Sequence, residues 1–338
     1  MKNILSLGLV AISLIALPSC NSKKYFEPEN TSKIQTQKLT LGSEIKFVNR
    51  DGATLYNGEY INKRGSGILN LGKGYRYINE SNRYLLAANG MGNLKIIDKT
   101  SKDTKVVVGL KVPVVTANVS GDVVVYLLED NSFGIYRISN NLKLWEGKSE
   151  RVFAIDNRVA NPIFVGNTIA LPTLDGKLLM INPNNKEATR AIYISADRNF
   201  NNAIHLSKIG SKLISASAHA VMVVSNGNEK RMRIKLSDVV VTNSAIYIFA
   251  KSGEIIKTDL NLNKLATIKF DYAHYSVVGI YNNKLYALDY KGSLIVLDSD
   301  LSQHRIYNFE DVDALTFISN NRLFKHKEVI ALDTLSYE

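Results

Sequence analysis

The chain has 338 residues, a formal net charge of +11 at pH 7, 45% hydrophobic residues and 22% charged residues. This balance is normal for a soluble globular protein, and the length suits one large all-β domain or two ordinary domains. Cys20 is the single cysteine, so the chain cannot form an internal disulfide bond.

The first 20 residues have the pattern of an export signal. Lys2 supplies a positive start, residues 4–17 form an apolar stretch with no charged residue, and Ser19 precedes Cys20. The apolar stretch is short for a membrane span but suits the core of a signal peptide. The segment resembles a bacterial lipoprotein signal with its lipobox, which implies removal of residues 1–19 and lipidation of Cys20. The alternative is an ordinary secretory signal with an unrelated cysteine.

Residues 20–36 are predicted to be a lipidated N-terminus followed by a flexible tether. They are polar, include Pro28 and show no periodicity. Asn21 follows the expected lipidation site. Asp at that position favours inner-membrane retention in enterobacterial lipoproteins, so Asn21 indicates the outer membrane. The basic charge then favours a solvated surface near anionic headgroups, and we expect no nucleic-acid partner.

Residues 37–338 repeat a strand, a tight turn and a second strand about every 40 residues. The clear copies of the second strand, each opened by a turn glycine and closed by Asp or Asn, are 92–98, 176–182, 253–259 and 292–298. Weaker copies place the turn at Gly52, Asn131, His219 and Lys327. Asn tolerates the left-handed conformation as Gly does, so His219 and Lys327 predict turns of another type.

Further strand candidates bring each repeat to four strands. Those before a hairpin are 112–119, 153–160, 238–243, 275–281 and 313–319, and those after one are 105–110, 142–147, 190–195, 231–236, 265–270 and 304–309. No window has a long helical period. Strand-only repeats of this length predict a single all-β β-propeller of seven or eight four-stranded blades. The last repeat lacks a fourth strand, which residues 37–41 are predicted to supply, closing the ring.

The repeated phrase G-x-L-x-x-[LI]-[DN], followed once by residues 140–147, resembles the PQQ-like repeat. Trp145 is the one tryptophan, whereas quinoprotein dehydrogenases carry a tryptophan in most blades. Together with the lipobox and tether, the propeller resembles the BamB family of outer-membrane assembly lipoproteins. That resemblance implies an eight-bladed, non-enzymatic ring that faces the periplasm and binds BamA-type machinery through loops on one face.

Known catalytic patterns are absent from the sequence. The five histidines (His205, His219, His274, His304 and His326) lack metal-ligand spacing. Two of them lie in or near repeat turns, and His304 lies on a predicted outer strand. Asp98, Asp259, Asp298 and Asp333 recur at matching positions, so we expect them to bind backbone at strand ends. We therefore expect no enzymatic activity, no metal site and no cofactor.

Two surface features leave alternatives open. Alternation places Arg231, Arg233 and Lys235 on one face of an outer strand, which either protects a sheet edge or contacts anionic lipid or an acidic partner. Tyr75, Tyr77 and Tyr84 are either strand residues or interface residues. The leading hypothesis is an outer-membrane scaffold that binds envelope proteins. The alternatives are a propeller that binds PQQ and Ca²⁺ at its centre, and a surface-exposed adhesin or receptor lipoprotein.

Overall fold

The computed structural model describes residues 24–34, 39–67, 69–152, 155–185, 187–197, 199–309 and 315–338. The predicted signal and Cys20 lie outside these ranges. All regular elements in the described residues are β-strands. No helix long and apolar enough to cross a membrane occurs among them.

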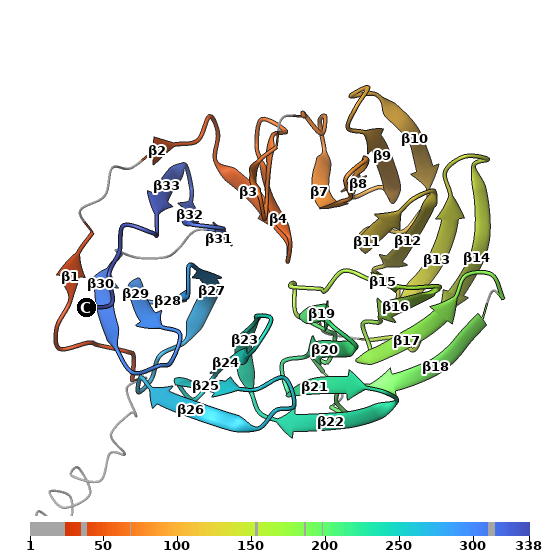
Figure 1. The fold of residues 1–338 in the computed structure, drawn as a ribbon. Helices are drawn as coiled ribbons and strands as arrows, with labels where there is room; N and C mark the ends of the chain where they lie inside the picture. Colours follow the sequence, from red (N-terminus) through yellow and green to blue (C-terminus); the bar gives the residue numbers. More distant parts are fainter. Residues whose placement is uncertain are drawn as a thin grey trace, which may run out of the picture.

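Eight antiparallel sheets are arranged around a ring as the blades of a β-propeller (Figure 1). Blade 1 consists of β3 (Ile45–Val48), β4 (Gly52–Leu55), β5 (Tyr60–Asn62) and β6 (Gly65–Ser66), and blade 2 of β7 (Tyr75–Glu80), β8 (Tyr84–Asn89), β9 (Asn93–Asp98) and β10 (Thr104–Gly109). Blade 3 consists of β11 (Val114–Ser120), β12 (Val123–Leu128), β13 (Ser132–Arg137) and β14 (Leu142–Lys148). Blade 4 consists of β15 (Ile163–Val165), β16 (Thr168–Pro172), β17 (Lys177–Asn182) and β18 (Glu187–Tyr193).

Blade 5 consists of β19 (His205–Ile209), β20 (Lys212–Ala216), β21 (Ala220–Ser225) and β22 (Asn228–Arg233), and blade 6 of β23 (Leu236–Val241), β24 (Ile246–Ala250), β25 (Glu254–Thr258) and β26 (Lys264–Lys269). Blade 7 consists of β27 (Tyr275–Tyr281), β28 (Lys284–Asp289), β29 (Ser293–Asp298) and β30 (His304–Asn308). Blade 8 consists of β31 (Thr316–Ser319), β32 (Arg322–Lys325) and β33 (Glu328–Ala331), together with β2 (Leu39–Thr40). The propeller therefore has eight blades, the larger of the two predicted numbers.

The ring closes through blade 8, whose outer strand comes from the N-terminal part of the chain. Strand β2 pairs antiparallel with β33, with Leu39 opposite Val329, and the Leu41 N–H donates to the Lys327 carbonyl at 2.7 Å. Ile45 of blade 1 and Phe324 of blade 8 share one apolar cluster. These contacts confirm the predicted closure for residues 39–41, whereas residues 37 and 38 lie outside the described ranges.

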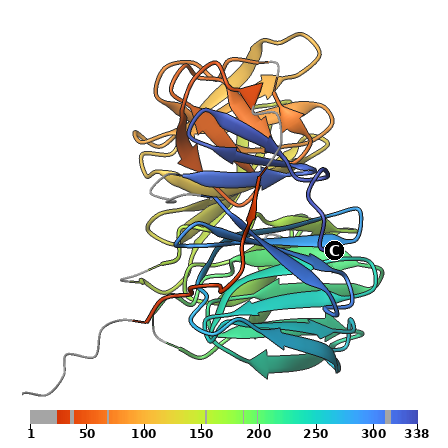
Figure 2. The ribbon, with the colours of Figure 1, turned by 90° about the vertical axis from the view of Figure 1, so that its left-hand side faces the viewer.

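The segment before this closing strand differs from the prediction. Residues 24–34, expected to belong to a flexible tether, pack along blade 7 and cross the edge of the ring (Figure 2). Strand β1 (Ser32–Lys33) pairs in parallel with β30, and the Phe26 ring lies edge-on to Phe270 at 5.9 Å. Strand β1 has only two residues, and Phe26 is a single aromatic contact, so this segment has no repeating pattern by which the sequence could predict its packing.

The turn predictions are largely confirmed. Asn131 has a φ of 63°, in the left-handed region that the repeat glycines also adopt. Neither His219 nor Lys327 has a positive φ, as predicted, but His326, which precedes Lys327 in the same turn, has a φ of 52°. Gly52 was assigned wrongly: it begins β4, and the equivalent turn contains Gly58, with a φ of 85°. Blade 1 has a glycine at both positions, and the spacing alone did not distinguish them.

One predicted inner strand is wrong. Within the predicted strand 153–160, residues 155–160 are not a strand, residues 153 and 154 lie outside the described ranges, and β15 begins only at Ile163. Val159 and Ala160 are buried while Asp156 and Arg158 are polar, so the stretch imitates strand alternation. The predicted outer strand at 231–236 lies three residues earlier, as β22.

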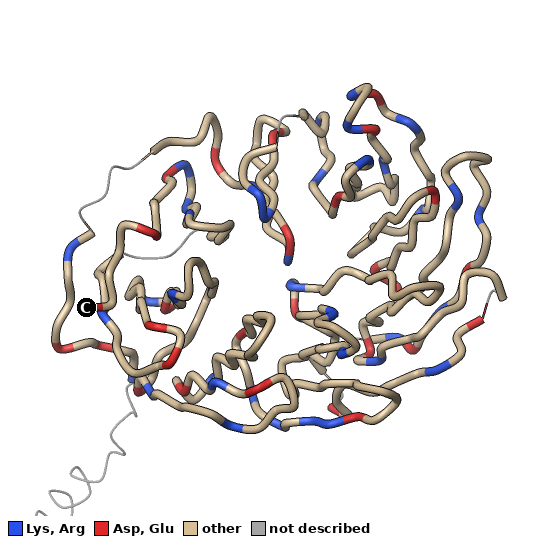
Figure 3. The backbone as a smooth tube through the Cα atoms, in the orientation of Figure 1, with Lys and Arg blue, Asp and Glu red and all other residues tan. Residues whose placement is uncertain are grey.

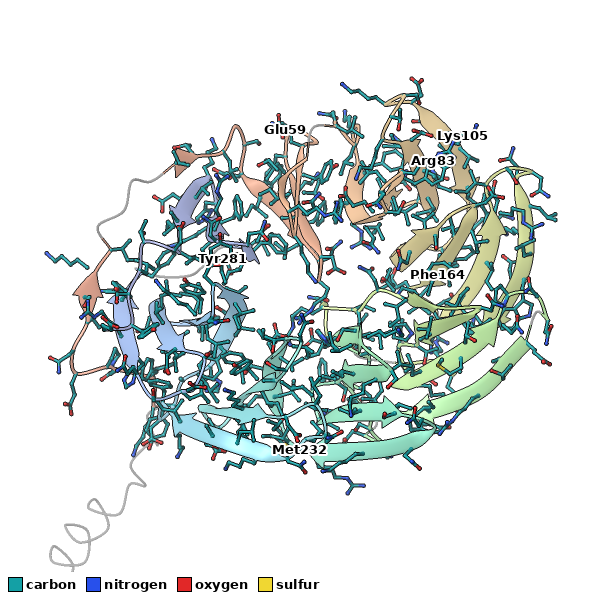
Figure 4. The ribbon with its side chains drawn as sticks, viewed as in Figure 1. Glu59, Arg83, Lys105, Phe164, Met232 and Tyr281 are labelled. Atoms are coloured by element: carbon teal, nitrogen blue, oxygen red, sulfur yellow. The ribbon has the colours of Figure 1, made fainter. Side chains whose placement is uncertain are left out.

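The core lies between neighbouring blades, where side chains from facing sheets pack together (Figure 4). Leu86 of blade 2 and Tyr126 of blade 3, for example, belong to one buried cluster. Trp145 lies on β14 and packs edge-on against Phe133 at 5.4 Å. Tyr77 stacks on Tyr60 at 5.0 Å and is buried, which favours the strand interpretation of the N-terminal tyrosines. Because both faces of each blade are covered, the apolar residues hold the ring together.

Candidate functional site

One face of the ring carries large exposed side chains. Successive strands of a blade run in opposite directions, so the turns between second and third strands and the connections between blades lie on the same side, here called the turn face. Tyr56, Met91 and Tyr290, in three such turns, are 64%, 75% and 60% exposed. Phe200 and Tyr272, in two connections, are 49% and 48% exposed. Exposed aromatic residues of this kind are common where proteins bind each other.

A pocket of about 630 Å³ opens on the turn face between blades 4 and 5. We call it the basic pocket. Its polar lining comes from the end of β18, the following connection, the β20–β21 turn and the end of β22: Tyr193, Ser195, Asp197, His219, Arg231, Arg233 and Lys235.

Strand alternation explains why the three cations of the pocket lie together. Arg231 and Arg233 are two residues apart on β22, and both are exposed. Met232 between them packs against the core shared by blades 5 and 6 (Figure 4). Lys235 continues the alternation beyond the strand and lines the same pocket. The predicted common face of these cations is confirmed.

Of these three cations, Arg231 alone forms hydrogen bonds and an ion pair with other described residues. The Arg231 guanidinium donates to the Tyr193 carbonyl at 2.7 and 2.9 Å and pairs with Glu229. Burial alone would raise the pKa of Glu229, but hydrogen bonds from Arg231 and Arg190 lower it. In the ranges that the structure covers, the side chains of Arg233 and Lys235 form no hydrogen bond or ion pair. The pocket therefore offers two unpaired cations to a carboxylate or phosphate.

The centre of the ring holds a second charged cluster. The turn between β3 and β4 points into the centre (Figure 3). From this turn the Arg50 guanidinium donates to Asp238 at 2.6 Å, to the Val239 carbonyl at 3.0 Å and to Nδ1 of His205 at 3.2 Å. No local sequence pattern predicts this contact, because Arg50 and Asp238 are 188 residues apart.

Further ion pairs extend this central cluster. Arg158 pairs with Asp156 at 2.5 Å and lies 3.7 Å from Asp238. Burial alone would lower the pKa of Arg158, but the hydrogen bond to Asp156 and the charge of Asp238 raise it. Asp51 pairs with Lys63 and accepts a hydrogen bond from Asn161. These ion pairs and hydrogen bonds thus link blade 1, blade 6 and the connection that precedes blade 4 at the centre of the ring.

His205 is held neutral in this cluster. Burial, together with the nearby charges of Arg50 and Lys63, places its pKa well below the usual value of 6.5. Because Arg50 donates to Nδ1, the proton is on Nε2, which lies 2.9 Å from the Ser207 hydroxyl. The neutral imidazole of His205 therefore accepts a hydrogen bond at Nδ1 and donates one from Nε2, which is a structural role.

The central residues do not fit a Ca²⁺-bound quinone. Calcium prefers six to eight oxygen ligands, whereas Asp51, Asp156 and Asp238 each engage a cation already. Among the described residues, no group of three or more His, Cys, Asp or Glu side chains is placed to hold a metal ion.

The other predicted site residues lie apart from one another. His219 and His326 are in turns and His304 is on the outer strand β30, as predicted. Asp98, Asp259 and Asp298 accept backbone N–H groups at strand ends, which confirms their scaffold role. The Asp333 carboxylate instead accepts a hydrogen bond from the Asn321 side-chain amide, at 3.1 Å.

Comparisons with known proteins support the fold. No protein-family model matches the chain. The plasminogen-binding protein PgbB from two Helicobacter pylori strains is 28% and 27% identical over 94% of this chain and 67% of its own length. Among solved structures, BamB from Moraxella catarrhalis aligns with a TM-score of 0.66 at 13% identity, covering 88% of this chain and 98% of that one. The C-terminal WD40 domain of Sif2 aligns with a TM-score of 0.64 at 12% identity, covering 89% and 99%. The chain thus has a BamB-like β-propeller fold.

Proposed function

We propose that this chain is a non-enzymatic, protein-binding propeller that lipidated Cys20 anchors to the outer membrane. The observation that carries the proposal is the basic pocket, where Arg233 and Lys235 are exposed and unpaired in the part of the chain that the structure describes. Arginine and tyrosine dominate binding energy in protein interfaces. The name of the Helicobacter pylori relative, a plasminogen-binding protein, also supports a protein partner.

The first candidate role is that of a periplasm-facing scaffold that assists the assembly of β-barrel outer-membrane proteins with BamA-type machinery. The BamB-like fold motivates this role. Crosslinking followed by affinity purification from the native envelope tests it. We expect assembly machinery to be captured by the wild-type chain and by Lys105→Glu, and to be lost from the double variant Arg233→Glu with Lys235→Glu. A wild-type capture without that machinery would refute this role.

The second candidate role is that of a surface-exposed receptor that binds plasminogen. Similarity to the Helicobacter pylori protein over 94% of the chain favours it. Protease treatment of intact cells should then degrade the propeller, and purified protein should bind immobilised plasminogen. A propeller that is protected in intact cells and does not bind plasminogen would leave only the scaffold role.

Anchoring by Cys20 has its own test. Mass spectrometry of the native protein should find acyl chains on an N-terminal Cys20 and no residues 1–19. The Cys20→Ala variant should yield a folded, soluble ring that loses function through mislocalisation. A released ring with full function would contradict the tethered scaffold.

A further inference from the structure

The N-terminal segment meets the turn face at blades 6 and 7. Lys24, the first described residue, has its ammonium group 5.4 Å from the centre of the Tyr272 ring. The Lys291 ammonium lies 4.5 Å from the centre of the Tyr25 ring. With Tyr290 these residues line a cavity of about 250 Å³. We call these five residues the anchor-side patch.

The covalent chain limits how far this patch can be from a lipidated Cys20. Three residues separate Cys20 from Lys24, so the four residue steps span at most about 14 Å even when fully extended. A tether reaching to residue 36 would have allowed the ring to turn freely. Because residues 24–34 are instead packed on blade 7, the anchor must hold this edge of the ring close to the headgroups.

The chemistry of the patch suits a membrane surface. Tyr25, Tyr272 and Tyr290 are 44%, 48% and 60% exposed, and tyrosine is enriched at the membrane–water interface, where its ring meets apolar and polar surroundings together. Lys24 and Lys291 are exposed and face anionic headgroups favourably.

Nearby acids leave this positive charge largely in place. Asp271 is paired with Lys269 at 2.7 Å, and buried Asp289 accepts the backbone N–H groups of His274 and Lys291. Glu27 and Glu29, the exposed acids that follow in the chain, lie outside the lining of this cavity. The exposed lysine and carboxylate side chains that line the cavity are therefore two lysines and no carboxylate.

We propose that the anchor-side patch docks on the anionic headgroup surface of the membrane that holds Cys20, which fixes the orientation of the ring. This inference rests on the proposed lipid anchor. Docking then places blades 6 and 7 against the bilayer and blade 2, across the ring, away from it (Figure 1).

Two single-cysteine probes test the inference on the lipidated protein, because an acylated Cys20 leaves an introduced cysteine as the one free thiol. Tyr290→Cys reports on the patch, and Met91→Cys is the matched control, an exposed turn residue in blade 2. Each is labelled with a fluorophore and placed in vesicles of phosphatidylcholine with phosphatidylglycerol that carry a headgroup quencher. We expect strong quenching at position 290 and little at position 91.

The dependence of docking on the charges of Lys24 and Lys291 and of the lipid headgroups gives a second readout. Replacing Lys24 and Lys291 by glutamine should reduce the docked-to-undocked ratio about fivefold per lysine in phosphatidylglycerol vesicles, and have little effect in pure phosphatidylcholine. Equal quenching at positions 290 and 91 would overturn the docking proposal while the anchor stands. A free Cys20 thiol in the native protein, detected by mass spectrometry, would instead refute the anchor itself.

Discussion

The centre of the ring and the basic pocket at its rim both gather arginine and lysine, but they use them differently. At the centre, Arg50 pairs with Asp238, and Arg158 pairs with Asp156 and lies 3.7 Å from Asp238. At the rim, Arg233 and Lys235 project from the end of an outer strand without a partner in the residues that the structure describes. Paired charges hold the blades in place, whereas unpaired and solvated ones remain available to a binding partner.

Among the variants that test this difference, we expect Arg50→Met to change the free energy of unfolding most. In Arg50→Met, Asp238, whose side chain is 7% exposed, loses its closest cation. Leaving a buried carboxylate without its partner costs about 3 kcal/mol of the free energy of unfolding. Chemical denaturation of the purified ring measures this loss.

The matched control for Arg50→Met is Arg83→Met. Arg83 also pairs with an aspartate, Asp98, but its side chain is 66% exposed. Exposed pairs contribute less than about 1 kcal/mol. Equal losses in the two variants would show that the central cluster does not hold the ring together.

A smaller effect should appear as pH dependence. Unfolded His205 binds a proton near pH 6.5, whereas folded His205 has a depressed pKa and binds none there. The unfolded state therefore binds more protons, so stability falls as the pH falls below 6.5, by about 1.4 kcal/mol per pH unit until the folded pKa is reached. Denaturation between pH 7 and 5 should show a shallower slope for His205→Gln. An unchanged slope would mean that this histidine is not held neutral.

The smallest effect on stability is expected at the rim. Arg233→Gln with Lys235→Gln should change the free energy of unfolding by less than about 0.5 kcal/mol, since neither side chain is buried or paired in the described structure. Partner capture should nevertheless fall about tenfold. The control Lys105→Gln changes an exposed lysine of outer strand β10 (Figure 4). If it lowers capture equally, general charge and not the pocket would govern binding.

Part of the site was predictable because it follows from local periodicity. Alternation along 228–235 predicted that Arg231, Arg233 and Lys235 share one face, and β22 confirms it. The pocket around them was not predictable, because Tyr193 and Asp197 come from the preceding blade. The central cluster left no local pattern, since its members come from different blades and are fixed by the ring as a whole.

The sequence by itself determined the repeat and the four-stranded unit, because a strand period of two and recurring turn residues are local properties. The missing fourth strand of the last repeat also predicted closure by the N-terminal strand, which the structure shows at residues 39–41. Only the tertiary structure decided that there are eight blades, that Arg50 crosses the centre to reach Asp238, and that residues 24–34 pack on blade 7. Those features depend on contacts between residues far apart in the chain. Such contacts form only when the ring closes, so they cannot be predicted from a repeating pattern along the sequence.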